Sequence, residues 1–379
     1  MARVPADPSN AALLYYQAFL LCPEVPVAVS SGWDDVLRGS EPSDAVWGYL
    51  RDCADAIAFA EAATRLVKCD WGIPQSGGLA TRLPQIGESL DLCKVLWVSA
   101  RVLARDGHYA AAFARCMTIR RFAGHIGDDM LLLYAASRQV DRGAQTCIRH
   151  ILGGMSSDEA TLAGLKDQLE SVRGAPLSPT RALRAHLELA LQTMRTRPDI
   201  LVEVRHQLTE RAKDESTRTE LQNLTDEALI SRAREPYSNF LDSAIQVMDS
   251  KLPYAEAYVE IQRLQKMLED KFRVDPAVSQ IIVACADQPL NMYCLQISDE
   301  AYLNALKVGI EIYLVLARTG RVPDKLGDDW PADPLTGDPF QYNRTDEGFV
   351  LRHSDKHIPG GGLRPMEFKV PTASALKNP

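Results

Sequence analysis

The 379-residue chain lacks two features that define large classes of protein: long apolar runs and a surplus of cations. No uninterrupted apolar run approaches the roughly 18 to 20 residues that cross a bilayer. Lys and Arg total 42 against 50 Asp and Glu, which gives a formal net charge of -8. General binding to nucleic acid needs surplus cations that release counterions from the phosphate backbone. We therefore expect a globular protein with no membrane span in this chain and no nucleic-acid partner.

An export signal is also missing from the residues at the start of the sequence. The segment Met1–Asn10 has no apolar stretch after Arg3, and a secretory signal requires one. Two interpretations stay open. The protein is cytoplasmic as written, or it is an exported protein of the cell envelope whose N-terminal signal has been removed.

The eight cysteines form no C-x-x-C pair and have no zinc-ribbon spacing. Four of them fall within helical patterns, namely Cys53, Cys93, Cys116 and Cys147. A free cysteine in such a pattern behaves as a small buried hydrophobe. Cys22 and Cys69 lie near expected helix ends, and a disulfide at either would need an oxidising compartment. We expect no metal and no cofactor, and the pairing of the cysteines stays open.

Apolar side chains recur at intervals of three and four residues from about residue 10 to residue 320, which predicts helices. One helix is expected from Ser43 to the turn at Cys69–Gly72. Its apolar residues share one face, and they are Val46, Tyr49, Leu50, Cys53, Ile57, Ala60 and Val67. Such a face must be buried against other helices.

A helical hairpin is predicted around Gly107. One apolar helix face ends at Arg105-Asp106-Gly107, and a second helix opens at His108-Tyr109. Small residues at Ala100 and Ala112 would let two antiparallel helices approach closely, while the turn needs glycine. This unit resembles one tetratricopeptide (TPR) hairpin, a family whose repeats recur about every 34 residues. A second copy at that period is missing, so we expect an array of antiparallel hairpins that is TPR-like in part.

Further helices are expected up to residue 319, the last two at 276–286 and 299–319. Pro236 predicts a break or kink within the helix at 225–250, because proline cannot donate the internal hydrogen bond. The densely charged stretch Glu210–Glu220 indicates a solvated helix or loop.

The tail after residue 320 changes character. Two short alternating segments, Phe340–Arg344 and Gly348–Arg352, predict a β-hairpin, and the rest of the tail is expected to be irregular. We therefore predict a mainly α fold with a small C-terminal antiparallel β element. Its parts are an N-terminal arm with a short helix (1–40), an α-helical domain (41–320) and the β-hairpin tail (321–379).

Several short motifs are spread over most of the chain. They are Asn10-Ala-Ala12 with Tyr15-Tyr16, Cys69-Asp-Trp-Gly72, Gly107-His-Tyr-Ala-Ala-Ala112, Arg121–Asp128, and Arg321-Val-Pro323 with Asp333–Tyr342. Together they resemble a broad group of uncharacterised, mostly helical exported bacterial proteins. Members of that group carry an N-terminal export or anchor segment, and the motifs define no known activity.

The tail has a pattern of its own, in which a helix up to Thr319 is followed by Gly320-Arg-Val-Pro323 and Asp333-Pro-Leu-Thr-Gly337. This order resembles the C-terminal part of type II secretion pseudopilins, where a long helix leads to a small antiparallel sheet. The chain departs from that family because it lacks the hydrophobic N-terminal helix on which a pilus is built. The chain also departs from the helical group of exported proteins. Members of that group have a strand containing Tyr-Ser at the position where this chain has Arg352–Asp355. The resemblance therefore implies a fold for the tail alone.

Familiar catalytic signatures are absent from the sequence, including the P-loop, H-E-x-x-H and G-x-S-x-G. Catalytic groups can still converge from distant segments. The first candidate is Cys69-Asp70-Trp71, where a thiol, a carboxylate and an indole at a helix end could line a pocket. In the competing interpretation, Trp71 fills the core and Asp70 caps a turn.

The second candidate is His125 with Asp128 and Asp129. An imidazole held by a carboxylate serves as a general base or a metal ligand. The carboxylates also suit the first turn of the next helix, where negative charge meets the positive end of the helix dipole.

The third candidate is the alternating set His353, Asp355 and His357. Alternate residues of an extended strand point to one side, so these three could converge on a divalent metal. At the surface end of a chain such residues are more often simply solvated.

Two hypotheses of function follow, and the sequence establishes no residue as catalytic. In the first, the protein is a non-enzymatic interaction or scaffold module of a bacterial cell. Its partner is another protein or peptide, bound at Cys69, Asp70, Trp71, His125 and Asp128. The alternative is a hydrolase-like enzyme with a site between helices, using His125 with Asp128 or Cys69 with Asp70.

Overall fold

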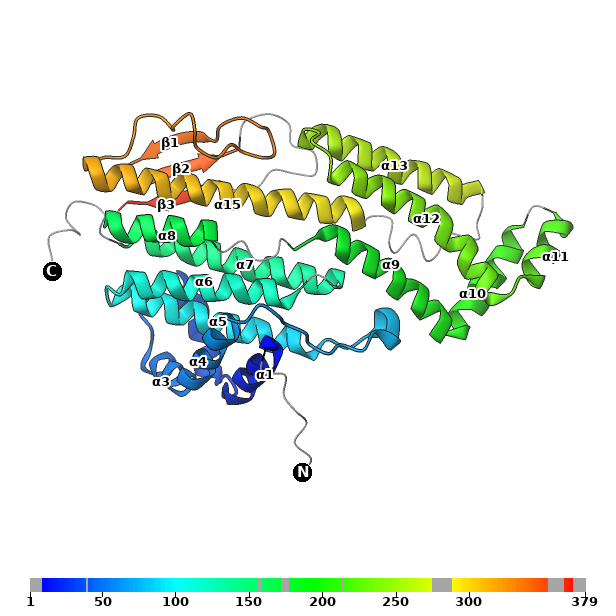
Figure 1. Ribbon diagram of the computed structural model, residues 1–379, viewed down its shortest axis with the longest axis horizontal. Helices are drawn as coiled ribbons and strands as arrows, with labels where there is room; N and C mark the ends of the chain where they lie inside the picture. The colour runs from blue at the N-terminus through cyan, green and yellow to red at the C-terminus, as the bar shows by residue number, and fades with distance from the viewer. Residues whose placement is uncertain are drawn as a thin grey trace, which may run out of the picture.

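The computed structural model describes residues 9–38, 40–127, 129–155, 158–171, 177–212, 214–274, 288–353 and 365–370. Within these ranges the chain forms fourteen α-helices, one short 3-10 helix and three β-strands. The prediction of a mainly helical protein with a small C-terminal antiparallel sheet is confirmed. The molecule is elongated, with most helices running along its length (Figure 1).

The helices begin where the sequence supplies capping side chains. Asn10, Ser43, Ser178, Asp214 and Thr225 each accept a hydrogen bond from a backbone amide two or three residues further on. These bonds satisfy amides that have no partner within the first helical turn.

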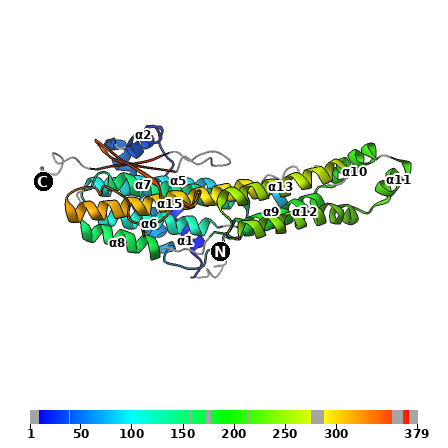
Figure 2. The same cartoon turned by 90° about the horizontal axis from the view of Figure 1, so that it is seen from above.

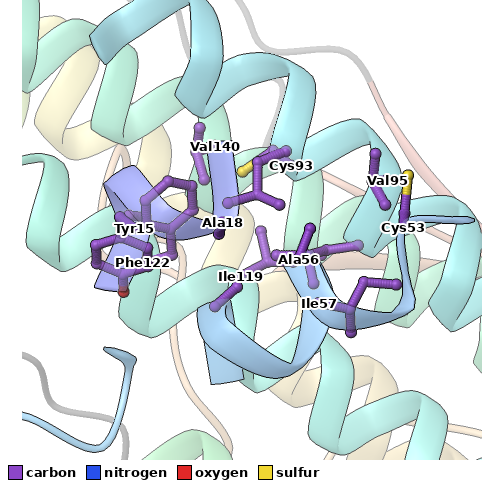
Figure 3. Packing of buried hydrophobic residues seen from close by; sticks show 14 of the residues in the cluster. Tyr15, Ala18, Cys53, Ala56, Ile57, Cys93, Val95, Ile119, Phe122 and Val140 are labelled. Atoms are coloured by element: carbon purple, nitrogen blue, oxygen red, sulfur yellow. The ribbon is translucent and has the colours of Figure 1, made fainter. Parts of the chain in front are cut away.

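The first of three hydrophobic cores lies among the N-terminal helices. These are α1 (Ala11–Leu21), α2 (Val27–Arg38), α3 (Asp44–Asp52), α4 (Ala54–Ala63), α5 (Pro84–Arg105), α6 (Tyr109–Ile126) and α7 (Leu131–Leu152). Figure 3 shows Tyr15 of α1 against Phe122 of α6, with Val140 of α7 nearby. The predicted N-terminal arm therefore contributes buried side chains such as Tyr15 and Trp33. The helix α2, which directly follows Pro26, was not predicted.

The single helix expected from Ser43 to Cys69 is two helices, because the chain turns at Cys53. Its predicted apolar face holds as far as Ala60, and Val46, Tyr49 and Ile57 are buried. The prediction for Val67 was wrong, since that side chain is almost fully exposed. Val67 lies beyond the end of α4 at Ala63, so helical spacing no longer sets its direction.

The predicted hairpin around Gly107 is confirmed as α5 followed by α6. Gly107 has a φ of 81°, in the left-handed region that glycine adopts without strain. Ala100 and Ala112 are both fully buried in the interface, so the two helices approach closely as the small residues predict.

The second core lies in a projecting arm of helices, which Figure 2 shows extending away from the rest of the molecule. Its members are α9 (Pro179–Thr196), α10 (Pro198–Arg211), α11 (Glu215–Asn223), α12 (Asp226–Met248) and α13 (Tyr254–Val274). Of the break or kink predicted at Pro236, the break was wrong, because α12 continues through the proline. Buried Ile230 and Tyr237 flank the proline and pack into this core, which holds the helix together. The helix expected at 276–286 lies outside the described residues.

The helix α15 (Gln288–Thr319) spans two cores, and it begins eleven residues before the expected start at Asp299. Tyr293 and Ala301 belong to the second core, whereas Ala305 and Tyr313 belong to the third. The third core also contains residues of α5, α6, α7 and α8 (Glu159–Ser171) together with the C-terminal sheet.

The sheet has the antiparallel order β1 (Gln341–Thr345), β2 (Gly348–Arg352) and β3 (Met366–Lys369). The predicted hairpin corresponds to β1 and β2, with Thr345 opposite Gly348. The third strand lies in a region expected to be irregular, and this expectation was wrong. Strand β3 forms because Met366 and Phe368 alternate inward onto α15, where Gly309 leaves room for the Phe368 ring.

Among the described residues, no helix combines the length and the apolarity that crossing a membrane requires.

Candidate functional site

Two of the predicted site segments meet in a cluster of rings. The indole Nε1 of Trp71 donates a hydrogen bond to the backbone oxygen of His125 over 2.7 Å. The hydroxyl of Tyr15 lies 2.8 Å from Nδ1 of the same histidine, and the Tyr15 ring stacks on Trp71 at 5.6 Å. These contacts bring together three segments that are distant in the sequence. Tyr15 of α1 is 110 residues from His125 of α6, and Trp71, in the loop after α4, is 54 residues from it.

Burial makes the titratable groups of this cluster unreactive. It lowers the pKa of His125, although the ring also donates a hydrogen bond to the backbone oxygen of Leu66, which acts in the opposite direction, so the imidazole is neutral at physiological pH. It also raises the pKa of the Tyr15 hydroxyl well above its usual value. Burial, together with the Asp70 carboxylate, raises the pKa of the Cys69 thiol to about 12. A thiol with that pKa is protonated near neutrality and is a poor nucleophile.

The carboxylates predicted to assist these groups have other roles or lie outside the described residues. Asp70 is exposed, and its Oδ1 accepts a hydrogen bond from Gly72 over 2.9 Å, so it caps the turn. Asp129 forms an ion pair with Arg181. Asp128 lies outside the described residues. Within the described part of the chain, no carboxylate forms a hydrogen bond or ion pair with His125.

The predicted metal set is only partly within the described residues, because Asp355 and His357 lie outside them. His353 is described, and its Nδ1 lies 2.9 Å from Oδ2 of the fully buried Asp333. Asp333 also accepts a hydrogen bond from the amide of Leu335. The described ranges contain no group of three or more His, Cys, Asp or Glu residues arranged to hold a metal ion.

A cavity that the sequence did not indicate lies where the helices meet the sheet. It has a volume of about 680 Å³, and we call it the basic groove. Arg101 of α5, Arg142 and Arg149 of α7, Tyr302 of α15 and Lys369 of β3 line it. His150 lines both this groove and an adjoining cavity of about 320 Å³, so the two cavities lie side by side.

The basic groove carries excess positive charge in an acidic protein. Its described lining has four permanent cations and a single carboxylate, Glu367. Two of the cations already have partners. Arg142 is paired with Asp299 and lies 5.0 Å from the centre of the Tyr302 ring, while Lys369 is 3.6 Å from Glu347.

Arg101 and Arg149 have no ion-pair partner among the residues that the structure describes. Both residues are half-buried. Burial lowers the pKa of Arg149, and Tyr302 and Glu367 oppose that shift from a distance. A cation that has lost part of its water without gaining an anion raises the free energy of the folded state. Such a pair of groups favours the binding of an anion.

A network of buried ion pairs is connected to Arg142 of the groove lining. Asp141 lies 2.8 Å from Arg120 and 3.0 Å from Arg138, and Arg138 in turn lies 3.1 Å from Asp299. Burial alone would raise the pKa of Asp141, but the two guanidinium groups outweigh it and the pKa is lowered. The network connects α6, α7 and α15, so it holds Arg142 in a defined position on the groove wall.

A third cavity, of about 720 Å³, lies between α2, α5, α6 and α7. Its walls are mostly apolar and include Trp33 and Trp97. The charged residues on its rim, Asp91 and Lys94, lie 3.1 Å apart and neutralise each other. It therefore lacks the unpaired charge that distinguishes the basic groove. Neither this cavity, the basic groove nor its neighbour is lined by Cys69, Trp71 or His125.

Comparisons with protein-family models, curated proteins and solved structures found no match to this chain. The basic groove therefore stands on its own geometry and charge. One sequence signal does point to it, since Arg142 and Arg149 are seven residues apart and share one face of α7. The other members come from α5, α15 and β3, which no spacing rule connects.

Proposed function

We propose that this protein is a non-enzymatic interaction module that binds an acidic segment of a partner protein in the basic groove. The observation that carries the proposal is a pair of half-buried arginines in the groove lining, Arg101 and Arg149, without ion-pair partners in the described chain. Carboxylates would form charge-assisted hydrogen bonds with both. The adjoining cavity continues the groove past His150, which suits an extended peptide better than a single small anion.

Two further features support a place among helical scaffold proteins. The close packing of α5 and α6 at Ala100 and Ala112 is the arrangement that suggests one TPR-like hairpin. The order of α15, the turn at Gly320 and an antiparallel sheet is the one that suggests a pseudopilin-like tail. We therefore also propose that the protein belongs to the group of exported bacterial proteins that its sequence resembles.

The hydrolase-like alternative has less support. It requires a reactive pair at Cys69 and Asp70 or at His125 and Asp128. The thiol of Cys69 is held protonated, and His125 forms its contacts with Tyr15 and Leu66. None of the three cavities described above opens onto either residue.

The direct test is the binding of a fluorescently labelled peptide of alternating Glu and Ser to the purified full chain. We expect saturable binding that weakens as salt rises, because exposed ion pairs are screened. A peptide with Gln in place of Glu should bind far less.

Variants Arg101→Gln and Arg149→Gln should each weaken binding of the acidic peptide by about five- to thirtyfold, as expected for loss of a charge-assisted hydrogen bond. Arg184→Gln is the matched control, because Arg184 carries the same charge but lies exposed on α9, paired with Asp242. Equal weakening by all three variants would show that net charge, and not the basic groove, governs binding. Absence of binding by the wild-type chain would refute the proposal.

A further inference from the structure

Two cysteines face each other at the edge of the first core. Cys22 caps the C-terminal end of α1, and Cys53 lies at the junction between α3 and α4. Their Sγ atoms are 3.8 Å apart. Cys53 is fully buried, whereas Cys22 is partly exposed to solvent. Figure 3 shows Cys53 at one side of the packed core residues.

The surroundings of the pair keep Cys22 in place. The Tyr49 hydroxyl donates a hydrogen bond to the backbone oxygen of Pro23 over 2.9 Å and lies 3.5 Å from the Cys22 sulfur. Tyr49 itself is buried in α3. The hydroxyl therefore fixes both the sulfur and the backbone that immediately follows it.

We propose that Cys22 is a peroxide-reactive thiol and that Cys53 resolves its oxidised form as an intramolecular disulfide. In the first step the Cys22 sulfur attacks one oxygen of hydrogen peroxide. The O–O bond breaks, hydroxide leaves, and Cys22 becomes a sulfenic acid. In the second step the Cys53 sulfur attacks that of Cys22. The S–S bond forms, the S–O bond breaks, and water leaves with the proton of Cys53. Overall, two thiols and one peroxide give one disulfide and two waters.

The geometry permits the second step with small movements. A disulfide needs a sulfur–sulfur distance of about 2.0 Å, so each sulfur moves inward by roughly 1 Å. Cys22 lies in the cap after α1 and Cys53 in the turn between two helices, and neither is in the middle of a helix. Closing the bond therefore displaces no residue in the middle of a helix.

The charge environment assigns the roles of the two sulfurs. A hydrogen bond from Cys53 lowers the pKa of Cys22 to about 7, against the effect of burial. Asp91 and Glu88 of α5 oppose the shift. The hydrogen bond with Cys22, burial and nearby Asp52 raise the pKa of Cys53. Cys22 is thus the thiolate that reacts first, and Cys53 keeps its proton until the second step.

Other thiols of the described chain lack this combination. Burial raises the pKa of Cys69, Cys93, Cys147 and Cys294. Cys294 is the best internal reference, because it is half-buried like Cys22 but lies on α15, beside Tyr254 of α13.

The test uses the reduced full chain and a substoichiometric amount of hydrogen peroxide, followed by alkylation and peptide mass spectrometry. We expect a cross-linked peptide pair that joins Cys22 to Cys53 and has lost two hydrogens. Cys22 should be consumed at least about tenfold faster than Cys294 near neutral pH. This competition within the wild-type chain needs no variant to fold.

Variants then separate the two steps. Cys53→Ser should accumulate a sulfenic acid on Cys22 that dimedone traps, and Cys22→Ser should form neither product. Cys294→Ser is the control and should form the disulfide as the wild type does. Equal oxidation of Cys22 and Cys294, or oxidation of Cys22 without a link to Cys53, would overturn the proposal.

Discussion

Arg149 shows how a single residue can favour ligand binding at the expense of stability. Its guanidinium is half-buried and has no ion-pair partner in the described chain, so folding removes water from the charge without replacing it by an anion. Arg120 is the opposite case, because it is buried against Asp141 at 2.8 Å. The same residue type therefore has opposite effects at two positions on neighbouring helices.

We predict that Arg149→Gln raises the free energy of unfolding by roughly 0.5 to 1 kcal/mol while it weakens acidic-peptide binding. Arg120→Gln should lower the free energy of unfolding by about 3 kcal/mol, because it leaves Asp141 buried and short of a partner. Urea denaturation followed by circular dichroism measures both. A loss of stability in Arg149→Gln would contradict the assignment of a desolvated, unpaired cation.

His125 gives a prediction about pH. Burial lowers its pKa below the unfolded value of about 6.5, so the unfolded chain binds more protons in mildly acidic solution. The contribution of His125 is therefore present above that pH, and stability is lost as the pH falls below it. His125→Gln should reduce the loss of stability between about pH 7 and pH 5.

Urea titrations of the wild type and the variant at these two pH values provide the measurement. Burial also lowers the pKa of His186, so part of the loss should persist in His125→Gln. His108→Gln is the control at an exposed histidine. An unchanged pH dependence in His125→Gln would show that the buried imidazole is not responsible.

At the scale of elements, the close approach of β3 to α15 depends on one glycine. A Cβ at Gly309 would lie 2.5 Å from the Phe368 ring, and that ring is itself stacked on Phe349 at 4.8 Å. The ring has little freedom to move aside, because both aromatic side chains are fully buried.

We predict that Gly309→Ala lowers the free energy of unfolding by about 1 to 3 kcal/mol through overpacking. Gly164→Ala on α8 is the matched control, since a Cβ there meets no atom within 4 Å. It should raise stability by roughly 0.5 to 1 kcal/mol, because alanine favours helix over glycine. Thermal unfolding of the two variants compares them directly. Equal effects would exclude the ring contact as the cause.

Elements with local signals could be predicted from the sequence, and those without could not. The hairpin of α5 and α6 was predictable because Gly107 and its small neighbours lie within a short stretch. Strand β3 was missed because it has only four residues and pairs with a strand that ends fourteen residues earlier, at Arg352. The missing amide hydrogen of Pro236 also predicted a break or kink, and core packing keeps α12 continuous through it.

The candidate site was less predictable for the same reason. Trp71 and His125 were each proposed from local patterns, but only the fold brings them into contact. The basic groove combines Arg101, Arg149 and Tyr302 from three helices. Whether an arginine of the basic groove has an ion-pair partner depends on how distant segments of the chain pack together, and the sequence does not show this.

At the scale of the whole molecule, the described chain has three hydrophobic cores, and α15 belongs to two of them. Its first half packs with α12 and α13, and its second half packs with α7, α8 and the sheet. A disturbance of one core can therefore reach the other through a single helix.

We predict that Leu241→Ala, in the second core, speeds amide hydrogen exchange in α9, α12 and the first half of α15 by about tenfold or more. Exchange in α6 should change much less. Leu306→Ala, in the third core, is the reciprocal variant and should speed exchange in α7, α8 and the second half of α15. Uniform acceleration across the chain in both variants would show that all cores unfold together.

The position of α15 late in the chain has a consequence for synthesis on the ribosome. The first core is built from residues up to Leu189 and can pack while later segments are still being made. The second and third cores both include residues of α15, so neither is complete until the chain from Gln288 onward has been made. Until that helix emerges, the parts of α8, α12 and α13 that pack against it stay exposed. We expect the nascent protein to require protection by chaperones during this interval.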